Sequence, residues 1–172
     1  TDLNDNDEED DDDDVDDEPI REKIGPGGCR AVACAASGKW LAGSGMTFGQ
    51  RYELLEELVI SNGRLRSTGA ASLAALMEDE DCTLKVLKLY ACQIDPEGCG
   101  YLGRALRFGK NRSLHTLHLD GDETVGDLGA KELARGLETI RSLCSLSLSG
   151  CAIKAAGAAA IGVALESSRC TI

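Results

Sequence analysis

Apolar residues recur along most of this chain at an interval of 29 or 30 residues. Aligned on leucine, four segments begin at Leu55, Leu84, Leu114 and Leu143. Each segment has apolar residues at its first, fourth and sixth positions, and the last two alternate with mainly polar neighbours. Because successive side chains of a strand point to opposite faces, this alternation predicts a short strand with one buried face. Four such strands in equivalent places predict a parallel sheet.

The second half of each segment has the spacing of a helix. A further apolar residue is followed four residues later by a glycine, and apolar residues then recur at steps of four. These later residues are Leu73 and Met77, Leu102 and Leu106, Leu133 and Leu137, and Ile161 and Leu165. The spacing places them on one face of a helix. A strand–loop–helix unit of this size cannot bury its own apolar face, so stacking of several units must create the core.

Two of the segments, LKVLKLYACQIDPEGCGYLGRAL and LCSLSLSGCAIKAAGAAAIGVAL, resemble the ribonuclease-inhibitor-like leucine-rich repeats. The resemblance implies an α/β leucine-rich-repeat solenoid, a horseshoe segment with a parallel concave sheet and convex helices. Where this family usually has Asn or Cys bonding the loop backbone, the four repeats have Gly63, Cys92, Asp122 and Cys151. The third repeat also carries an extra residue in its Asp-Gly-Asp-Glu loop, which leaves its register open.

The repeats divide the chain into three parts. Residues 55–172 hold four repeats, 55–83, 84–113, 114–142 and 143–171, and the first residue of a fifth. Residues 19–54 have the spacing of the helical half of a degenerate repeat with a Gly-rich insertion, or they form a flexible linker. Residues 1–18 hold thirteen acidic side chains and no Lys or Arg, whereas the rest has 17 acidic and 18 basic residues. The net charge of −12 therefore belongs to an acidic tail that we expect to be disordered.

No pattern in the chain is typical of an enzyme or a cofactor site. Gly38 and Lys39 resemble the end of a phosphate-binding loop, but the leading glycine and the following Ser or Thr are missing. The eight cysteines lack zinc spacing, and equivalent cysteines two layers apart would lie about 10 Å from each other, too far for a disulfide. His115 and His118 point to opposite faces of a strand and cannot share a metal. We therefore predict a non-catalytic protein without cofactor or metal, in the reducing cytoplasm.

The concave face of the sheet is the predicted binding site, because side chains between the buried leucines point out from it. The predicted contact residues are Glu57, Val86, Lys88, Tyr90, Thr116, His118, Asp120, Ser145 and Ser147. Tyr90 is the best anchor, since an aromatic ring with a polar tip suits an interface hot spot. Lys88, His118 and Asp120 would tune charge complementarity around it.

These features predict a scaffold that binds a partner protein of unidentified kind, with the acidic tail as a second contact for a basic protein. Nucleic acid and membrane are poor partners, because the repeats carry no basic excess and no run of about 18 apolar residues occurs. The resemblance leaves two alternatives: a Ran-type GTPase-activating regulator, or the sensor segment of a nucleotide-binding immune receptor. Since the fourth layer ends without a capping unit, we expect the chain to be marginally stable or to self-associate.

Overall fold

A computed structural model describes residues 55–79, 82–109 and 112–167. The predictions for the acidic tail, for residues 19–54 and for the fifth repeat lie outside these ranges. Strands and helices alternate in the order β1 (Glu57–Ser61), α2 (Arg66–Met77), β2 (Val86–Tyr90), α3 (Pro96–Phe108), β3 (Thr116–His118), α4 (Gly126–Leu137), β4 (Ser145–Ser147) and α5 (Ala155–Ser167). None of the helices in the described ranges is long and apolar enough to cross a membrane.

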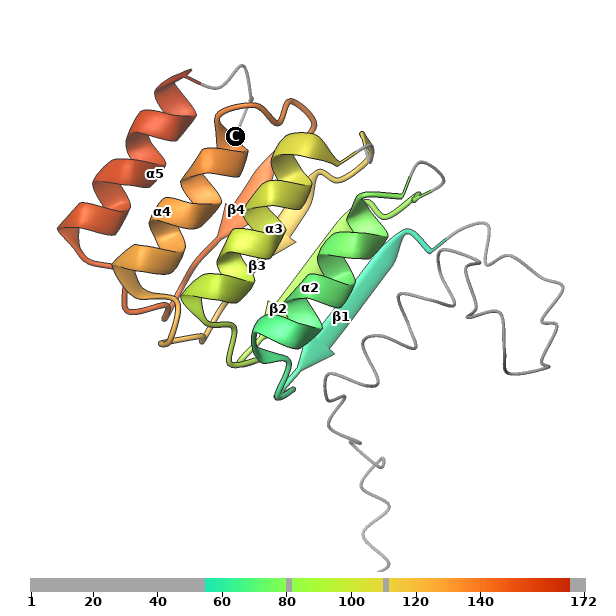
Figure 1. Cartoon of the computed structure of the whole chain (residues 1–172), viewed down its shortest axis with the longest axis horizontal. Coiled ribbons are helices and arrows are strands. Elements are labelled where there is room, and N and C mark those ends of the chain that lie inside the picture. Colours follow the sequence, from blue (N-terminus) through green and yellow to red (C-terminus); the bar gives the residue numbers. More distant parts are fainter. Residues whose placement is uncertain (1–54, 80–81, 110–111, 168–172) are drawn as a thin grey trace, which may run out of the picture.

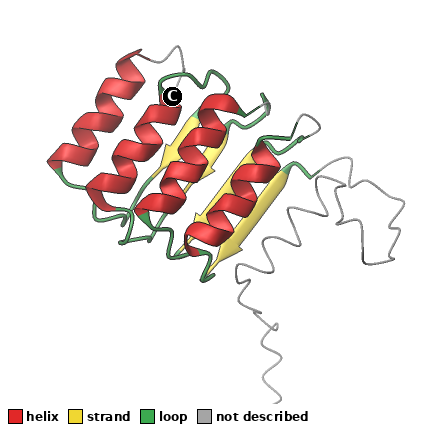
Figure 2. Cartoon of the chain, viewed as in Figure 1, coloured by secondary structure: helices red, strands yellow, loops and turns green. Residues whose placement is uncertain are grey.

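The four strands form one parallel sheet in the order β1-β2-β3-β4, and the helices lie side by side on one of its faces (Figures 1 and 2). The register sets Leu58 beside Leu87, Leu87 beside Leu117 and Leu117 beside Leu146. The extra residue of the third repeat therefore stays in the loop after β3 and does not shift the strand. The predicted α/β leucine-rich-repeat solenoid is confirmed.

The core consists of the predicted leucines in stacked layers. Leu87, Leu89, Leu117 and Leu119 are fully buried between the sheet and the helices. Burial falls at the last layer, where the equivalent residues Leu146 and Leu148 are only partly buried. Each layer is therefore covered by its neighbours, as expected when a single repeat cannot enclose its own apolar face.

The loops that follow the strands are held by the residues found where the family usually has Asn or Cys. Asp122 is 2% exposed, and its carboxylate accepts hydrogen bonds from the backbone N–H groups of Gln93 (2.7 Å) and Ile94 (3.2 Å) in the preceding repeat. The thiol of Cys151 donates to the carbonyl oxygen of Leu119 at 2.8 Å. A buried carboxylate in the third repeat and a buried thiol in the fourth thus have the same structural role. Each forms hydrogen bonds with backbone groups of the preceding repeat that water cannot reach.

The cysteines of the described ranges take part in no disulfide. Four of them are buried like small hydrophobic residues, and burial raises the pKa of Cys92 to about 11 and that of Cys99 to about 12. Cys144 differs, because it is exposed at the start of the fourth repeat.

Two contacts fix how closely the helices approach one another. Gly103 in α3 lies against the backbone of α4, where an added methyl group would overlap the carbonyl oxygen of Glu132. Asp127, in the first turn of α4, accepts hydrogen bonds from the backbone N–H groups of Lys154 and Gly157, both at 2.8 Å. These bonds lower the pKa of Asp127 and satisfy N–H groups at the start of α5 from the neighbouring layer.

Candidate protein-binding face of the sheet

The face of the sheet that the helices leave uncovered, here called the open face, carries all nine predicted contact residues. The strand register aligns them in rows across the repeats. One row is Glu57, Val86, Thr116 and Ser145, and the next is Val59, Lys88, His118 and Ser147. A third row begins with Ser61 and Tyr90 and continues beside Asp120, whose carbonyl oxygen accepts from the N–H of Ala91 at 2.9 Å. The open face is therefore one continuous surface built from four repeats.

Most side chains of the open face are half-buried, and two groups of them are already ordered by mutual contacts. The first group is the ion pair between Lys88 and Glu57, whose Nζ and Oε1 atoms lie 3.0 Å apart. The hydrogen bond to Glu57 raises the pKa of Lys88, so the ammonium group stays charged through the neutral range. Tyr90 lies one row further along the same strand and is half-buried.

The second group surrounds His118. Its Nε2 atom lies 3.2 Å from Oγ of Ser145, and its Nδ1 atom lies 4.0 Å from Oδ2 of Asp120. The other carboxylate oxygen of Asp120 accepts hydrogen bonds from the hydroxyl of Ser147 and from the N–H of Ser149 (2.9 Å). A cluster held in this way loses little conformational freedom when a partner binds.

A serine, a histidine and an aspartate thus meet on the open face, which the sequence reasoning did not foresee. Their geometry is not that of a catalytic triad, because 4.0 Å between His118 and Asp120 exceeds hydrogen-bond range. The residues come from different repeats, 27 positions apart in the case of His118 and Ser145. Only the strand register brings such residues together, and spacing along the sequence gives no sign of it.

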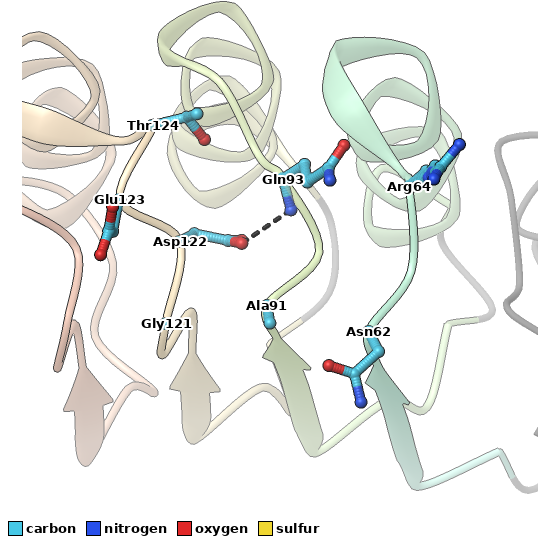
Figure 3. A pocket seen from close by; sticks show the side chains of 8 residues that line it. All are labelled: Asn62, Arg64, Ala91, Gln93, Gly121, Asp122, Glu123 and Thr124. Atoms are coloured by element: carbon cyan, nitrogen blue, oxygen red, sulfur yellow. Dashed lines mark hydrogen bonds between the residues drawn. The ribbon is translucent and has the colours of Figure 1, made fainter.

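An open pocket of about 400 Å³ adjoins the third row, at the carboxyl ends of β1, β2 and β3. It is lined by Asn62, Arg64, Ala91, Gln93, Gly121, Asp122, Glu123 and Thr124 (Figure 3). Figure 3 shows the carboxylate of Asp122 directed at the backbone of Gln93, so this buried acid holds the loop in place. No group of three or more His, Cys, Asp or Glu in the described ranges could hold a metal ion.

Comparison with known proteins agrees with this architecture. A family model described as leucine-rich repeat matches residues 139–162. The ribonuclease inhibitors of Sus scrofa and Mus musculus are 36% identical over 105 residues and 37% identical over 103 residues. The repeats of this chain are of the ribonuclease-inhibitor-like leucine-rich kind. The human NACHT, LRR and PYD domains-containing protein 13 is 31% identical to this leucine-rich-repeat chain over 115 residues.

The matches cover 56% and 59% of this leucine-rich-repeat chain for the two inhibitors and 67% for the human protein. The chain spans only 22% of the length of each inhibitor and 11% of that of the human protein. The similarity therefore identifies the kind of repeat. It does not extend to the activities of the much longer relatives.

Proposed function

We propose that this chain is a non-catalytic scaffold that binds a partner protein on the open face of its sheet. The observation that carries the proposal is the alignment of side chains from four repeats into rows on one uncovered face. A surface of this kind offers a partner several side chains at fixed spacing. Its contacts can therefore be distributed over all four strands.

Tyr90 is the proposed anchor of this surface. It lies on β2, an inner strand, two residues after Lys88 of the ion pair and in the row that continues beside Asp120. An aromatic side chain that is half-buried in the free protein has little rotamer freedom to lose on binding. Charged groups near the ring would set orientation and on-rate more than affinity.

The names of the relatives suggest two partner settings. A ribonuclease is the first defined ligand to test, because two ribonuclease inhibitors are among the relatives. The similarity to the NACHT, LRR and PYD domains-containing protein supports the second setting, the sensor segment of a larger receptor. A Ran-type GTPase-activating role would instead show as faster GTP hydrolysis by a small GTPase in the presence of the chain.

The experiment compares the wild-type chain with a double variant of the open face, Tyr90→Ala with Lys88→Glu. The matched control is Phe108→Ala with Arg107→Glu on α3, where the Arg107 guanidinium lies 5.0 Å from the centre of the exposed Phe108 ring. Both double variants remove one aromatic ring and reverse one positive charge. Proteins captured from native lysate are quantified for each, and a ribonuclease is titrated in parallel by calorimetry.

We expect the open-face variant to lose the captured partner, with affinity falling more than about tenfold, as for a hot-spot residue. The control should capture it as the wild type does. If both variants bind equally well, the open face is not the binding site. If capture disappears only when residues 1–18 are deleted, the acidic tail is the contact instead.

A further inference from the structure

The pocket at the carboxyl ends of β1, β2 and β3 crosses three consecutive repeats and is lined mainly by two equivalent positions of the repeat. The first position comes directly after the third row of the open face, and the second lies two residues further along the chain. These positions hold Asn62, Ala91 and Gly121, and Arg64, Gln93 and Glu123, all exposed. The pocket therefore extends the open face beyond the ends of the strands and runs in the direction in which the repeats stack.

The second position carries a positive charge at one end of the pocket and a negative charge at the other. Figure 3 shows the uncharged Gln93 between Arg64 and Glu123. Neither charged side chain has an ion pair or a hydrogen bond with any of the described residues, whereas Lys88 on the open face is paired with Glu57. A phosphate would be attracted by Arg64 and repelled by Glu123. The two charges therefore favour a ligand that carries both signs.

The middle of the pocket has the chemistry of a site for a peptide backbone. The side-chain amides of Asn62 and Gln93 form no hydrogen bond with the described residues, and each can both donate and accept, as a peptide unit does. The ends of β2 and β3 contribute only the small residues Ala91 and Gly121, which allow a polypeptide to approach closely. The volume of about 400 Å³ lies within the range of ligand pockets.

Hydrogen bonds between the repeats hold the pocket in shape. The N–H of Gln93 donates to the buried carboxylate of Asp122 at 2.7 Å, and Oγ1 of Thr124 donates to the carbonyl oxygen of Ile94, also at 2.7 Å. Ala91 and Gln93 have φ angles of 50° and 58°, which residues other than glycine seldom adopt and which persist only where the surroundings fix them. The loops are thus ordered before a ligand binds, so binding costs little conformational freedom.

We propose that this pocket binds an extended segment of the partner protein in which an acidic and a basic residue lie four positions apart. The acidic side chain pairs with Arg64 and the basic one with Glu123, while Asn62 and Gln93 bond the main chain between them. In an extended chain, residues four positions apart point to the same side and are separated by about 13 Å. Arg64 and Glu123 are two layers apart, which is about 10 Å at the sheet, and their side chains cover the difference. The inference rests on the function proposed above, because it specifies the chemistry of that partner.

Titration of the 172-residue chain with two short peptides, followed by the NMR chemical shifts of its backbone amides, tests the proposal. The first peptide, acetyl-Thr-Glu-Thr-Ser-Thr-Arg-Thr-amide, has its charges four positions apart, and its threonines favour extension. The second, acetyl-Thr-Thr-Glu-Arg-Ser-Thr-Thr-amide, has the same composition with the charges adjacent. In low salt, the first should shift the N–H signals of Gln93 and Gly121 until they saturate. The second should bind about fivefold more weakly, because it can form only one of the two exposed ion pairs.

Exchange of the two charges separates recognition from folding. Arg64→Glu and Glu123→Arg should each weaken binding of the first peptide by about fivefold, because an attraction becomes a repulsion. The double variant should restore binding, since the peptide can then lie in the pocket in the opposite direction. The proposal is overturned if the wild type shows no saturating shifts, if the two peptides bind equally well, or if the single variants bind as the wild type does.

The outcome is independent of the test of the open face. Tyr90 and Lys88 do not line the pocket, so the variant Tyr90→Ala with Lys88→Glu should bind the first peptide as the wild type does. Failure of the peptide titration therefore removes the pocket as a binding site, whereas the capture assay decides separately whether the open face binds the partner.

Discussion

The same mutation at two equivalent positions of the repeat should change stability in opposite directions. Gly103 in α3 and Gly162 in α5 occupy the same place in successive helices, but only Gly103 is covered by a neighbouring helix. Replacing each by alanine adds one methyl group and removes the backbone freedom of glycine in the unfolded chain. The two variants therefore separate helix propensity from the cost of packing.

Alanine in a helix interior is more favourable than glycine by about 0.5–1 kcal/mol. At Gly162 this gain is retained, because no neighbouring element of the described chain comes within 4 Å of the added methyl group. At Gly103 the methyl group meets backbone atoms of Glu132 and Leu133, which can only yield if α3 and α4 move apart. Overpacking costs about 1–3 kcal/mol. Because the contacted atoms belong to the backbone and cannot move independently, we expect a cost near the upper end, about 3 kcal/mol. The net loss at Gly103 should be about 2 kcal/mol, so the variants should differ by about 3 kcal/mol.

Equilibrium unfolding in urea, followed by circular dichroism at low protein concentration, measures both effects. The transition midpoint should rise for Gly162→Ala and fall for Gly103→Ala, with little change in slope. If both variants shift the midpoint in the same direction by similar amounts, then the helix contact at Gly103 is not as close as the structure shows.

Three further predictions rest on the same structure. Asp127→Ala should destabilise α5. Because the pKa of Asp127 is lowered in the folded state, the difference from wild type should be present above its ordinary value of 3.8 and vanish as the pH falls through the folded pKa, as urea unfolding at several pH values would show. Iodoacetamide at neutral pH should modify Cys144 and spare Cys99, whose thiol is buried and has a pKa of about 12, and mass spectrometry checks this. Leu117→Ala should cost about 2–5 kcal/mol in unfolding free energy, whereas Leu146→Ala in the partly uncovered last layer should cost clearly less.

The fold was predictable because the repeat period fixes it. Leu58, Leu87, Leu117 and Leu146 recur at equivalent positions, and a strand with one buried face must turn each of them the same way. The extra residue after β3 left the register of the third repeat open in the sequence. The structure shows that burial of Leu117 and Leu119 holds that register and that the loop absorbs the insertion.

The composition of the candidate site was also predictable, since alternation alone assigns residues to the open face. The contacts within it were not, because they depend on the register between repeats. Alternation predicts that the side chain of His118 lies on the open face. Only the register between the repeats brings its Nε2 atom to 3.2 Å from Oγ of Ser145. The sequence also offered no sign that Asp122 holds the loop of the preceding repeat, because its backbone partners lie 28 and 29 residues earlier in the chain.

The open face and the stacked core place different demands on the fold. Residues of the open face stand on leucines that are already buried, so replacing Tyr90 or Lys88 removes little packing from the core. Leu117 and Gly103 belong to the stack itself, where each layer draws much of its stability from the layer beside it. Substitutions on the open face therefore test binding with little effect on stability, whereas substitutions in the stack test the fold.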